Sequence, residues 1–134
     1  MKAAKTILLA GMVFLIVISL TACSTADSSA SASRVVEDYF QALVEKDLNQ
    51  MINLSCSTWE EQARNEYSSF AAVDLKLQDL KCQTSSQENN AAVVTCSGKM
   101  IASYGAENLE IDIAEQTYQV IQEAGEWHMC GYTP

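Results

Sequence analysis

The sequence has few of the residues that most often carry catalysis and metal binding. It contains one histidine, His128, and no Cys-x-x-Cys pair; His128 and Cys130 would share one strand face, but two ligands are too few for zinc. It also contains no glycine-rich phosphate-binding loop and no nucleophile elbow. We therefore expect no catalytic residue, no metal site and no cofactor, and we interpret the chain as a protein that is not an enzyme.

Basic residues are scarce as well. The 134 residues include eight Lys and Arg against 17 Asp and Glu. All 17 acidic residues but only six basic ones follow Cys23, which gives that part of the chain a net charge of −11. Clustered Lys and Arg side chains neutralise phosphate when proteins bind nucleic acids or anionic lipid headgroups. The charge pattern therefore argues against both kinds of binding and indicates a solubilising acidic surface.

One long apolar run is present, and it lies near the start of the chain. The short basic segment MKAAK is followed by residues 7–22, which carry no charge. As a helix these residues would span about 24 Å, whereas the hydrocarbon core of a bilayer is about 30 Å thick. A basic start, a short apolar core and a small-residue step are the three parts of a cleaved secretory signal. The pattern predicts such a signal, with an uncleaved membrane span as the alternative.

The end of this run carries a resemblance to a known processing site. Leu20, Thr21, Ala22 and Cys23 match the bacterial lipobox, at which signal peptidase II processes lipoproteins. The resemblance implies cleavage after Ala22 and a diacylglyceryl thioether on Cys23. The protein would then be anchored in a cell membrane or outer membrane with its domain on the extracytoplasmic side, because two acyl chains make a stable anchor. A plain secretory signal remains an alternative.

The cysteine count fits this interpretation. Five cysteines is an odd number, but lipidation of Cys23 leaves four, which in an exported domain predicts two disulfides. Cys82 and Cys96 flank the turn-forming stretch SSQENN, and a hairpin centred there brings them opposite each other at about 4.5 Å, within the range of a disulfide. Cys56 would then pair with Cys130. Four buried free thiols are the alternative.

The chain divides into three segments. Residues 1–22 form the predicted signal peptide, and residues 23–33 form a lipidated tether whose sequence, STADSSASAS after Cys23, has little to bury. Ten such residues have a root-mean-square span of about 17–19 Å. Residues 34–134 form the folded domain.

Helical periodicity dominates the first part of this domain. Apolar residues recur at a spacing of three to four from Ser33 onward, and Asp47-x-x-Gln50 resembles a capping box for a short second helix. Ser57 and Thr58 each offer a cap for a third. The apolar stripes are predicted to form the core; they comprise Val35, Val36, Tyr39, Phe40, Leu43 and Val44, then Leu48, Met51, Ile52 and Leu54, then Trp59, Ala63, Tyr67 and Phe70.

After residue 72 the period changes to two. A change of phase predicts a bulge near Gln78 and Asp79, and a second strand covers about residues 91–103. A third strand begins at Leu109 and resumes at Tyr118 on the other parity, and residues 127–132 close the sheet. The expected fold class is α+β, with the N-terminal helices packed on a curved antiparallel sheet of four strands.

This order of elements resembles the nuclear transport factor 2-like domains. VVEDYFQALVEKDLNQMINL is similar to their first two helices, and GEWHMCGY is similar to their last strand. The resemblance implies a cone-like sheet around the helices, sometimes with a pocket in its mouth. Enzymes of this fold place Asp, His or Tyr inside the cone, but no residue here maps onto a catalytic motif. His128 lies between the larger apolar residues Trp127 and Met129, which are expected to face the core and leave His128 on the opposite face.

These observations predict where the protein is located more firmly than what it does. We expect a membrane-anchored lipoprotein that serves as a binding or interaction module, attached through the lipid on Cys23 and able to contact a protein partner in the envelope. A small-molecule enzyme or carrier that uses the cone pocket is the alternative. A purely structural envelope component is a third hypothesis.

Overall fold

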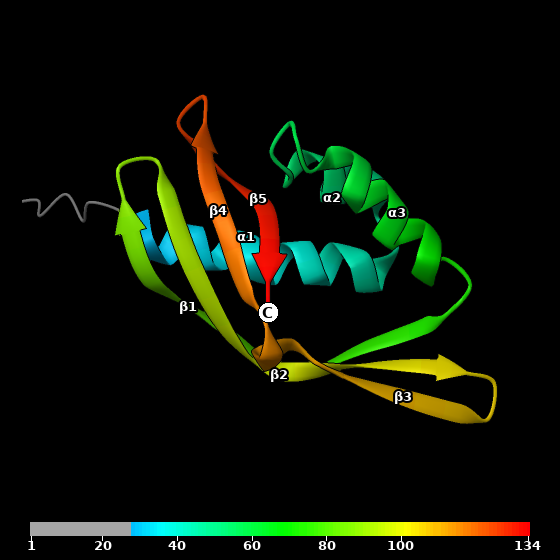
Figure 1. The fold of residues 1–134 in the computed structure, drawn as a ribbon. Coiled ribbons are helices and arrows are strands. Elements are labelled where there is room, and N and C mark those ends of the chain that lie inside the picture. The colour runs from blue at the N-terminus through cyan, green and yellow to red at the C-terminus, as the bar shows by residue number, and fades with distance from the viewer. Residues whose placement is uncertain (1–27) are drawn as a thin grey trace, which may run out of the picture.

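The computed structural model describes residues 28–134, in which three α-helices precede a curved antiparallel sheet of five strands (Figure 1). The elements in chain order are α1 (Ser28–Glu45), α2 (Leu48–Asn53), α3 (Glu60–Phe70), β1 (Asp74–Glu88), β2 (Ala91–Tyr104), β3 (Glu107–Asp112), the short 3-10 helix η1 (Ile113–Glu115), β4 (Thr117–Glu123) and β5 (Glu126–Thr133). The predicted signal peptide and the lipidation of Cys23 lie outside the described residues. No helix within residues 28–134 is both long and apolar enough to cross a bilayer.

Helix α1 packs against the sheet through the stripe that the sequence predicts. Val36, Tyr39 and Leu43 are buried, and the helix contacts β1, β2, β4 and β5. It begins at Ser28 rather than at Ser33, so the last part of the predicted tether, residues 23–33, is helical. Alanine has the highest helix propensity, and Ala32 is completely buried. Packing of Ala32 into the core, which the composition of this serine-rich stretch does not reveal, accounts for the longer helix.

The next two helices differ in how they begin. Asp47 caps α2 as predicted, because its carboxylate accepts a 2.9 Å hydrogen bond from the backbone N–H of Gln50. The predicted cap of α3 is wrong. Trp59 occupies the N-cap position without a side-chain hydrogen bond. Ser57 is engaged elsewhere, because its hydroxyl donates to Glu123 at 3.0 Å, and Thr58 lies 3.2 Å from Cys56 Sγ.

Strands β1 and β2 form a long hairpin with the predicted bulge. Their register is interrupted between Gln78 and Lys81, where Asp79 has a φ of 53°. Gly98 on β2 faces this bulge with a φ of 99°, and a Cβ atom there would lie 2.5 Å from the carbonyl oxygen of Gln78. The position therefore requires glycine because of both its backbone conformation and the space around it.

The sheet has five strands, not the four predicted, because the predicted third strand is divided in two. β2 pairs with β3 along one part of its length and with β4 along another, and the strand order is β1-β2-β4-β5. The 3-10 helix η1 turns the chain between β3 and β4, and Asp112 accepts a 2.9 Å hydrogen bond there from the N–H of Ala114. Ile113 is buried in the core, and its carbonyl accepts a 2.8 Å hydrogen bond from the Tyr118 hydroxyl.

Two disulfides join the pairs that the sequence favours. Cys82–Cys96 links β1 to β2 at directly opposed positions, with a Cα–Cα distance of 4.0 Å. Cys56–Cys130 links the segment after α2 to β5, with a Cα–Cα distance of 5.2 Å. The backbone N–H of Cys56 also donates to the carbonyl of Met129 at 2.8 Å. The second disulfide thus closes the helical layer onto the last strand.

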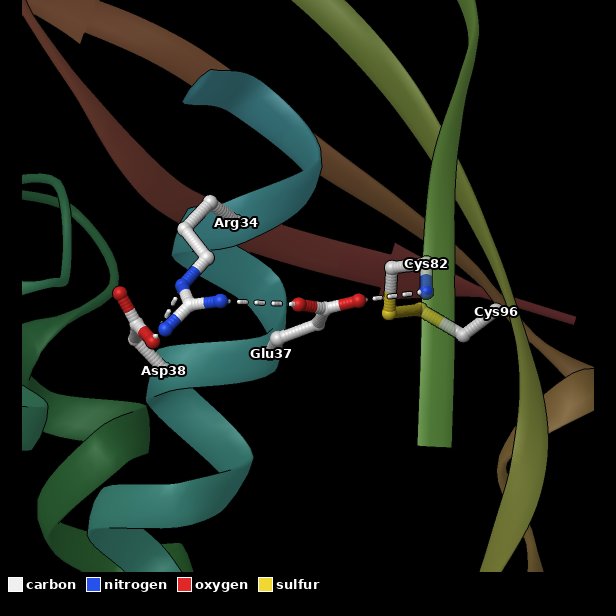
Figure 2. A network of polar contacts seen from close by, with 5 residues as sticks. All are labelled: Arg34, Glu37, Asp38, Cys82 and Cys96. Carbon is white, nitrogen blue, oxygen red and sulfur yellow. Dashed lines mark hydrogen bonds and ion pairs between the residues drawn. A yellow bond between two sulfur atoms is a disulfide. The ribbon is translucent and has the colours of Figure 1, made fainter. Parts of the chain in front are cut away.

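A polar network connects α1 to β1 beside the first disulfide (Figure 2). Glu37 accepts a 2.9 Å hydrogen bond from the backbone N–H of Cys82, and its other carboxylate oxygen lies 3.8 Å from Arg34. Arg34 also pairs with Asp38 at 3.0 Å on the exposed side of the helix. Exposed ion pairs contribute little to stability, whereas a carboxylate that accepts a backbone N–H makes a stronger, charge-assisted bond. Glu37 therefore fixes the position of α1 on the sheet.

Candidate functional site

A partly enclosed pocket of about 150 Å³ lies between α1, α3 and the sheet. Apolar and aromatic side chains make up most of its wall, and the two polar exceptions are Glu66 and Gln116. The aromatic lining residues are Tyr39 and Phe40 from α1, Phe70 from α3 and Tyr132 from β5; the aliphatic ones are Leu43, Met100, Ile111 and Met129. An apolar wall with a few polar groups is typical of ligand pockets.

Glu66 is the charged group of this pocket. The Tyr39 hydroxyl donates a 2.7 Å hydrogen bond to its Oε2 atom, which joins α1 to α3. Burial raises the pKa of the Glu66 carboxyl above its ordinary value of 4.5, while hydrogen bonds from Tyr39, Tyr132 and Gln62 lower it in part. The carboxyl is therefore partly buried in an environment that disfavours its charge, and the neutral donors offset part of that effect.

The two phenols beside Glu66 stay protonated. Tyr39 is 1% exposed, and burial raises its pKa, as does the neighbouring charge of Glu66. Burial first, and the Glu66 charge second, raise the pKa of Tyr132 to about 12. Both side chains are therefore neutral hydrogen-bond donors at neutral pH. They solvate the Glu66 carboxylate without neutralising its charge.

Aromatic packing holds these donors in place. The Tyr132 ring lies edge-on to Trp59, with ring centroids 5.3 Å apart, and Phe40 lies edge-on to Tyr118 at 5.4 Å. The indole Nε1 of Trp59 is buried without a hydrogen-bond partner. It lies close enough to the Tyr39 hydroxyl to lower the pKa of that group, although the geometry is not that of a hydrogen bond. The pocket wall is thus a packed aromatic cluster.

The residues considered from sequence fall mostly outside this pocket. Tyr39 lines it, while Tyr118 is buried behind it and binds the Ile113 carbonyl. His128 lies on the other face of β5, as predicted, with Nδ1 3.2 Å from the Asn53 carbonyl, while Trp127 and Met129 are buried. Within residues 28–134 no group of three or more His, Cys, Asp or Glu side chains is placed to hold a metal ion.

Sequence reasoning missed Glu66, although a signal was present. Glu66 follows Ala63 by three positions and precedes Phe70 by four, so it lies on the apolar stripe of α3. A carboxylate on a stripe of core residues indicates a buried charge with specific partners. Its partner Tyr39 is 27 positions away in the chain, and only the folded structure brings the two together.

Comparison with known proteins identifies the fold. No protein-family model and no curated protein sequence matches the chain. It is similar to the intermembrane space region of the chloroplast protein ARC6, with 10% identity, 78% of this chain and 94% of that chain covered, and a TM-score of 0.59. It is similar to a protein of the NTF2-like family from Streptomyces avermitilis, with 12% identity, coverages of 78% and 92%, and a TM-score of 0.55. An NTF2-like protein of unknown function from Pseudomonas putida KT2440 is also similar, with 10% identity, coverages of 78% and 83%, and a TM-score of 0.55.

These similarities define an NTF2-like (nuclear transport factor 2-like) fold, which confirms the architecture expected from the sequence. At sequence identities of 10–12%, the similarity shows a shared fold and does not show a shared activity. The function must therefore be argued from the pocket and from the sequence itself.

Proposed function

We propose that this protein is an exported lipoprotein, anchored through Cys23, whose NTF2-like domain is a binding module. The pocket between α1, α3 and the sheet would be its binding site. The observation that carries this proposal is the half-buried carboxyl of Glu66, which lies in a wall of aromatic and aliphatic side chains. A neutral hydroxyl donates a hydrogen bond to this carboxyl, and the pocket lies next to it. Partial burial of a carboxylate is unfavourable unless the charge is paired and hydrogen-bonded, and contact with a ligand would add such a partner.

The sequence supports the anchoring part of the proposal. A basic start, the apolar run of residues 7–22 and the lipobox ending at Cys23 are together typical of a lipoprotein signal. Two disulfides in the domain suit an oxidising, extracytoplasmic compartment. Membrane attachment would come from the lipid, because the acidic domain has no basic cluster with which to bind anionic headgroups.

Binding accounts for the pocket better than catalysis does. The two phenols that contact Glu66 have raised pKa values and serve as its donors, so neither is prepared to act as a base. The alternative is a small-molecule enzyme with Glu66 as general acid or base, which the raised pKa of Glu66 favours. The volume of about 150 Å³ is below the roughly 300 Å³ at which ligand pockets of ordinary size begin, so either function would be limited to a small ligand or to one chemical group of a larger one.

The binding site can be tested with a pair of matched substitutions on β3. Ile111→Trp fills the pocket from a half-buried lining position, whereas Leu109→Trp places the same ring two residues away at a side chain that is 52% exposed. Protein carrying each substitution would be purified from its own envelope, and the molecules that co-elute would be quantified by mass spectrometry. We expect the Leu109→Trp protein to retain the same molecules as the unsubstituted protein and the Ile111→Trp protein to lose them. Equal retention by both would contradict the proposed site.

The anchor can be tested separately by Cys23→Ser. This change should move the protein from the membrane fraction to the soluble fraction, while Ser24→Ala, next to the site, should leave it in the membrane. Membrane retention of Cys23→Ser would contradict lipid attachment and would leave the pocket proposal standing.

A further inference from the structure

We propose that the pocket selects an organic cation, namely an alkylammonium group whose charge pairs with Glu66 and whose methyl or methylene groups contact the surrounding rings. This inference rests on the proposed binding role and names the chemistry of the ligand. Three properties of the described residues support it: the charge of Glu66, the aromatic wall and the size of the cavity.

Among residues 28–134, the Glu66 carboxylate has hydrogen-bond donors but no positively charged partner. Tyr39 donates a 2.7 Å hydrogen bond to it, and Tyr132 and Gln62 lie close enough to lower its pKa; all three side chains are uncharged. None of the ion pairs found among residues 28–134 includes Glu66. Lys46, the basic residue that directly follows α1, donates to the Phe70 carbonyl. A partly buried carboxylate that lacks an opposite charge bears an uncompensated desolvation cost, which a cationic ligand would offset.

The wall of the pocket suits a cation more than an anion or a sugar. Tyr39, Phe40, Phe70 and Tyr132 present aromatic surface to the cavity. The negative faces of aromatic rings attract ammonium groups, and the attraction is stronger where the site is desolvated. The domain as a whole carries a strong negative charge, which concentrates cations at its surface and repels anions.

The size of the cavity limits the ligand. A cavity of about 150 Å³ is comparable to one that holds a benzene molecule. It therefore admits a quaternary ammonium headgroup or the end of a lysine side chain, and it is too small for a large ring system. Both candidates present the same chemistry, a positive nitrogen that carries carbon substituents.

The test compares cations with neutral molecules of the same shape. Choline and n-butylammonium would be titrated into the isotope-labelled full chain in a non-ionic detergent, followed by NMR; 3,3-dimethylbutan-1-ol and 1-butanol would serve as neutral counterparts. We expect each preferred cation to shift signals of the pocket residues and to bind at least about tenfold more tightly than its counterpart. Preference for choline would indicate a quaternary headgroup, and preference for n-butylammonium would indicate a primary amine such as lysine.

Two substitutions separate the charge of Glu66 from general electrostatics. Glu66→Gln keeps an acceptor for Tyr39 and should weaken cation binding at least about tenfold while leaving the alcohols unaffected. Glu61→Gln makes the same charge change at an exposed position of α3 and should leave cation binding unchanged. Equal affinity for cations and alcohols would overturn the inference while leaving a binding pocket in place. Absence of cation binding up to the solubility of the probes, or full binding by the Glu66→Gln protein, would also overturn it.

A pH series provides a readout that does not depend on any substitution. The titratable groups that face Glu66 are Tyr39 from α1, Tyr118 from β4 and Tyr132 from β5, and their raised pKa values keep them neutral throughout the acidic range. Only Glu66 then changes charge in the pocket as the pH falls. Cation affinity should decline below the pKa of Glu66 by up to about tenfold per pH unit. A flat affinity from pH 8 to about pH 4 would contradict pairing with Glu66.

Discussion

The hydroxyl of Tyr39 on α1 donates a 2.7 Å hydrogen bond to the carboxylate of Glu66 on α3. Two helices that make few other polar contacts are thereby joined at the wall of the pocket. The same bond keeps a charged group in an environment that burial makes unfavourable for it. The stability of the domain and the chemistry of the pocket therefore depend on the same pair of residues.

Removal of the donor should destabilise the domain. Tyr39→Phe leaves the ring in place but removes one hydrogen bond from a buried carboxylate, which costs about 1–3 kcal/mol in free energy of unfolding. It should also raise the pKa of Glu66 further, because the Tyr39 hydrogen bond lowers that pKa. Urea unfolding at neutral pH measures the first effect. Tyr67→Phe, at a half-buried position on the same helix as Glu66, is the control and should change stability by less than about 0.5 kcal/mol. Equal effects of the two substitutions would show that the hydrogen bond is unimportant.

Removal of the Glu66 charge should stabilise the domain. The pKa of Glu66 is higher in the folded state than its ordinary 4.5, so the folded state binds the proton more tightly than the unfolded state. The stability of the protein therefore falls as the pH rises through the interval between 4.5 and the raised pKa. We expect Glu66→Gln to be more stable than the unsubstituted protein at neutral pH, with the difference vanishing below pH 4.5. Denaturant unfolding across this range checks the sign, and a difference that grows on acidification would refute it.

Gly98 should not tolerate a side chain. In Gly98→Ala the new Cβ would lie 2.5 Å from the Gln78 carbonyl oxygen, which belongs to the β1 backbone at the bulge. The cost should exceed the roughly 1–2 kcal/mol of a left-handed conformation alone. Gly105→Ala provides the control, because its φ is also positive, at 65°, but no atom lies within 4 Å of the added Cβ. Thermal unfolding should show a much larger loss for Gly98→Ala than for Gly105→Ala. Similar losses would mean that the backbone of β1 moves away.

The two disulfides should contribute unequally. Cys56–Cys130 closes a sequence separation of 74 residues and Cys82–Cys96 one of 14. Loop-closure entropy then predicts a stabilisation of about 4 kcal/mol from Cys56–Cys130 and about 3 kcal/mol from Cys82–Cys96. Cys82–Cys96 also lies within a hairpin whose two strands are already aligned by backbone hydrogen bonds. Unfolding of the two double Cys→Ala proteins tests the order, and a larger loss from removal of the Cys82–Cys96 pair would contradict it.

The sequence predicted local structure better than the division of the sheet. The α1 stripe, the Asp47 cap and the bulge near Asp79 follow from spacing over a few residues, and the structure confirms each of them. The sequence also showed that Ile113 and Tyr118 break the alternation of inward and outward side chains. A bulge and a 3-10 turn break this alternation in the same way. The pairing of β2 with both β3 and β4 distinguishes them, and that pairing is a tertiary property.

The same limit explains the errors at the helix ends and at the site. Ser57 and Thr58 both matched a capping pattern, but Glu123 lies close enough in the fold to engage Ser57 instead. Glu66 was detectable as a charged residue on an apolar stripe, yet its role depends on Tyr39 and Tyr132, which come from distant parts of the chain. Spacing within one helix indicates which side chains face inward, and it does not show what they meet.

The intact mass of the protein extracted from a membrane fraction would decide whether the chain is exported, processed and lipidated at Cys23. The account predicts a chain that begins at Cys23, carries a diacylglyceryl group and has lost four hydrogen atoms through the two disulfides. Peptide mapping without reduction should recover Cys56 with Cys130 and Cys82 with Cys96. A mass that retains residues 1–22, or a chain without lipid on Cys23, would contradict the account.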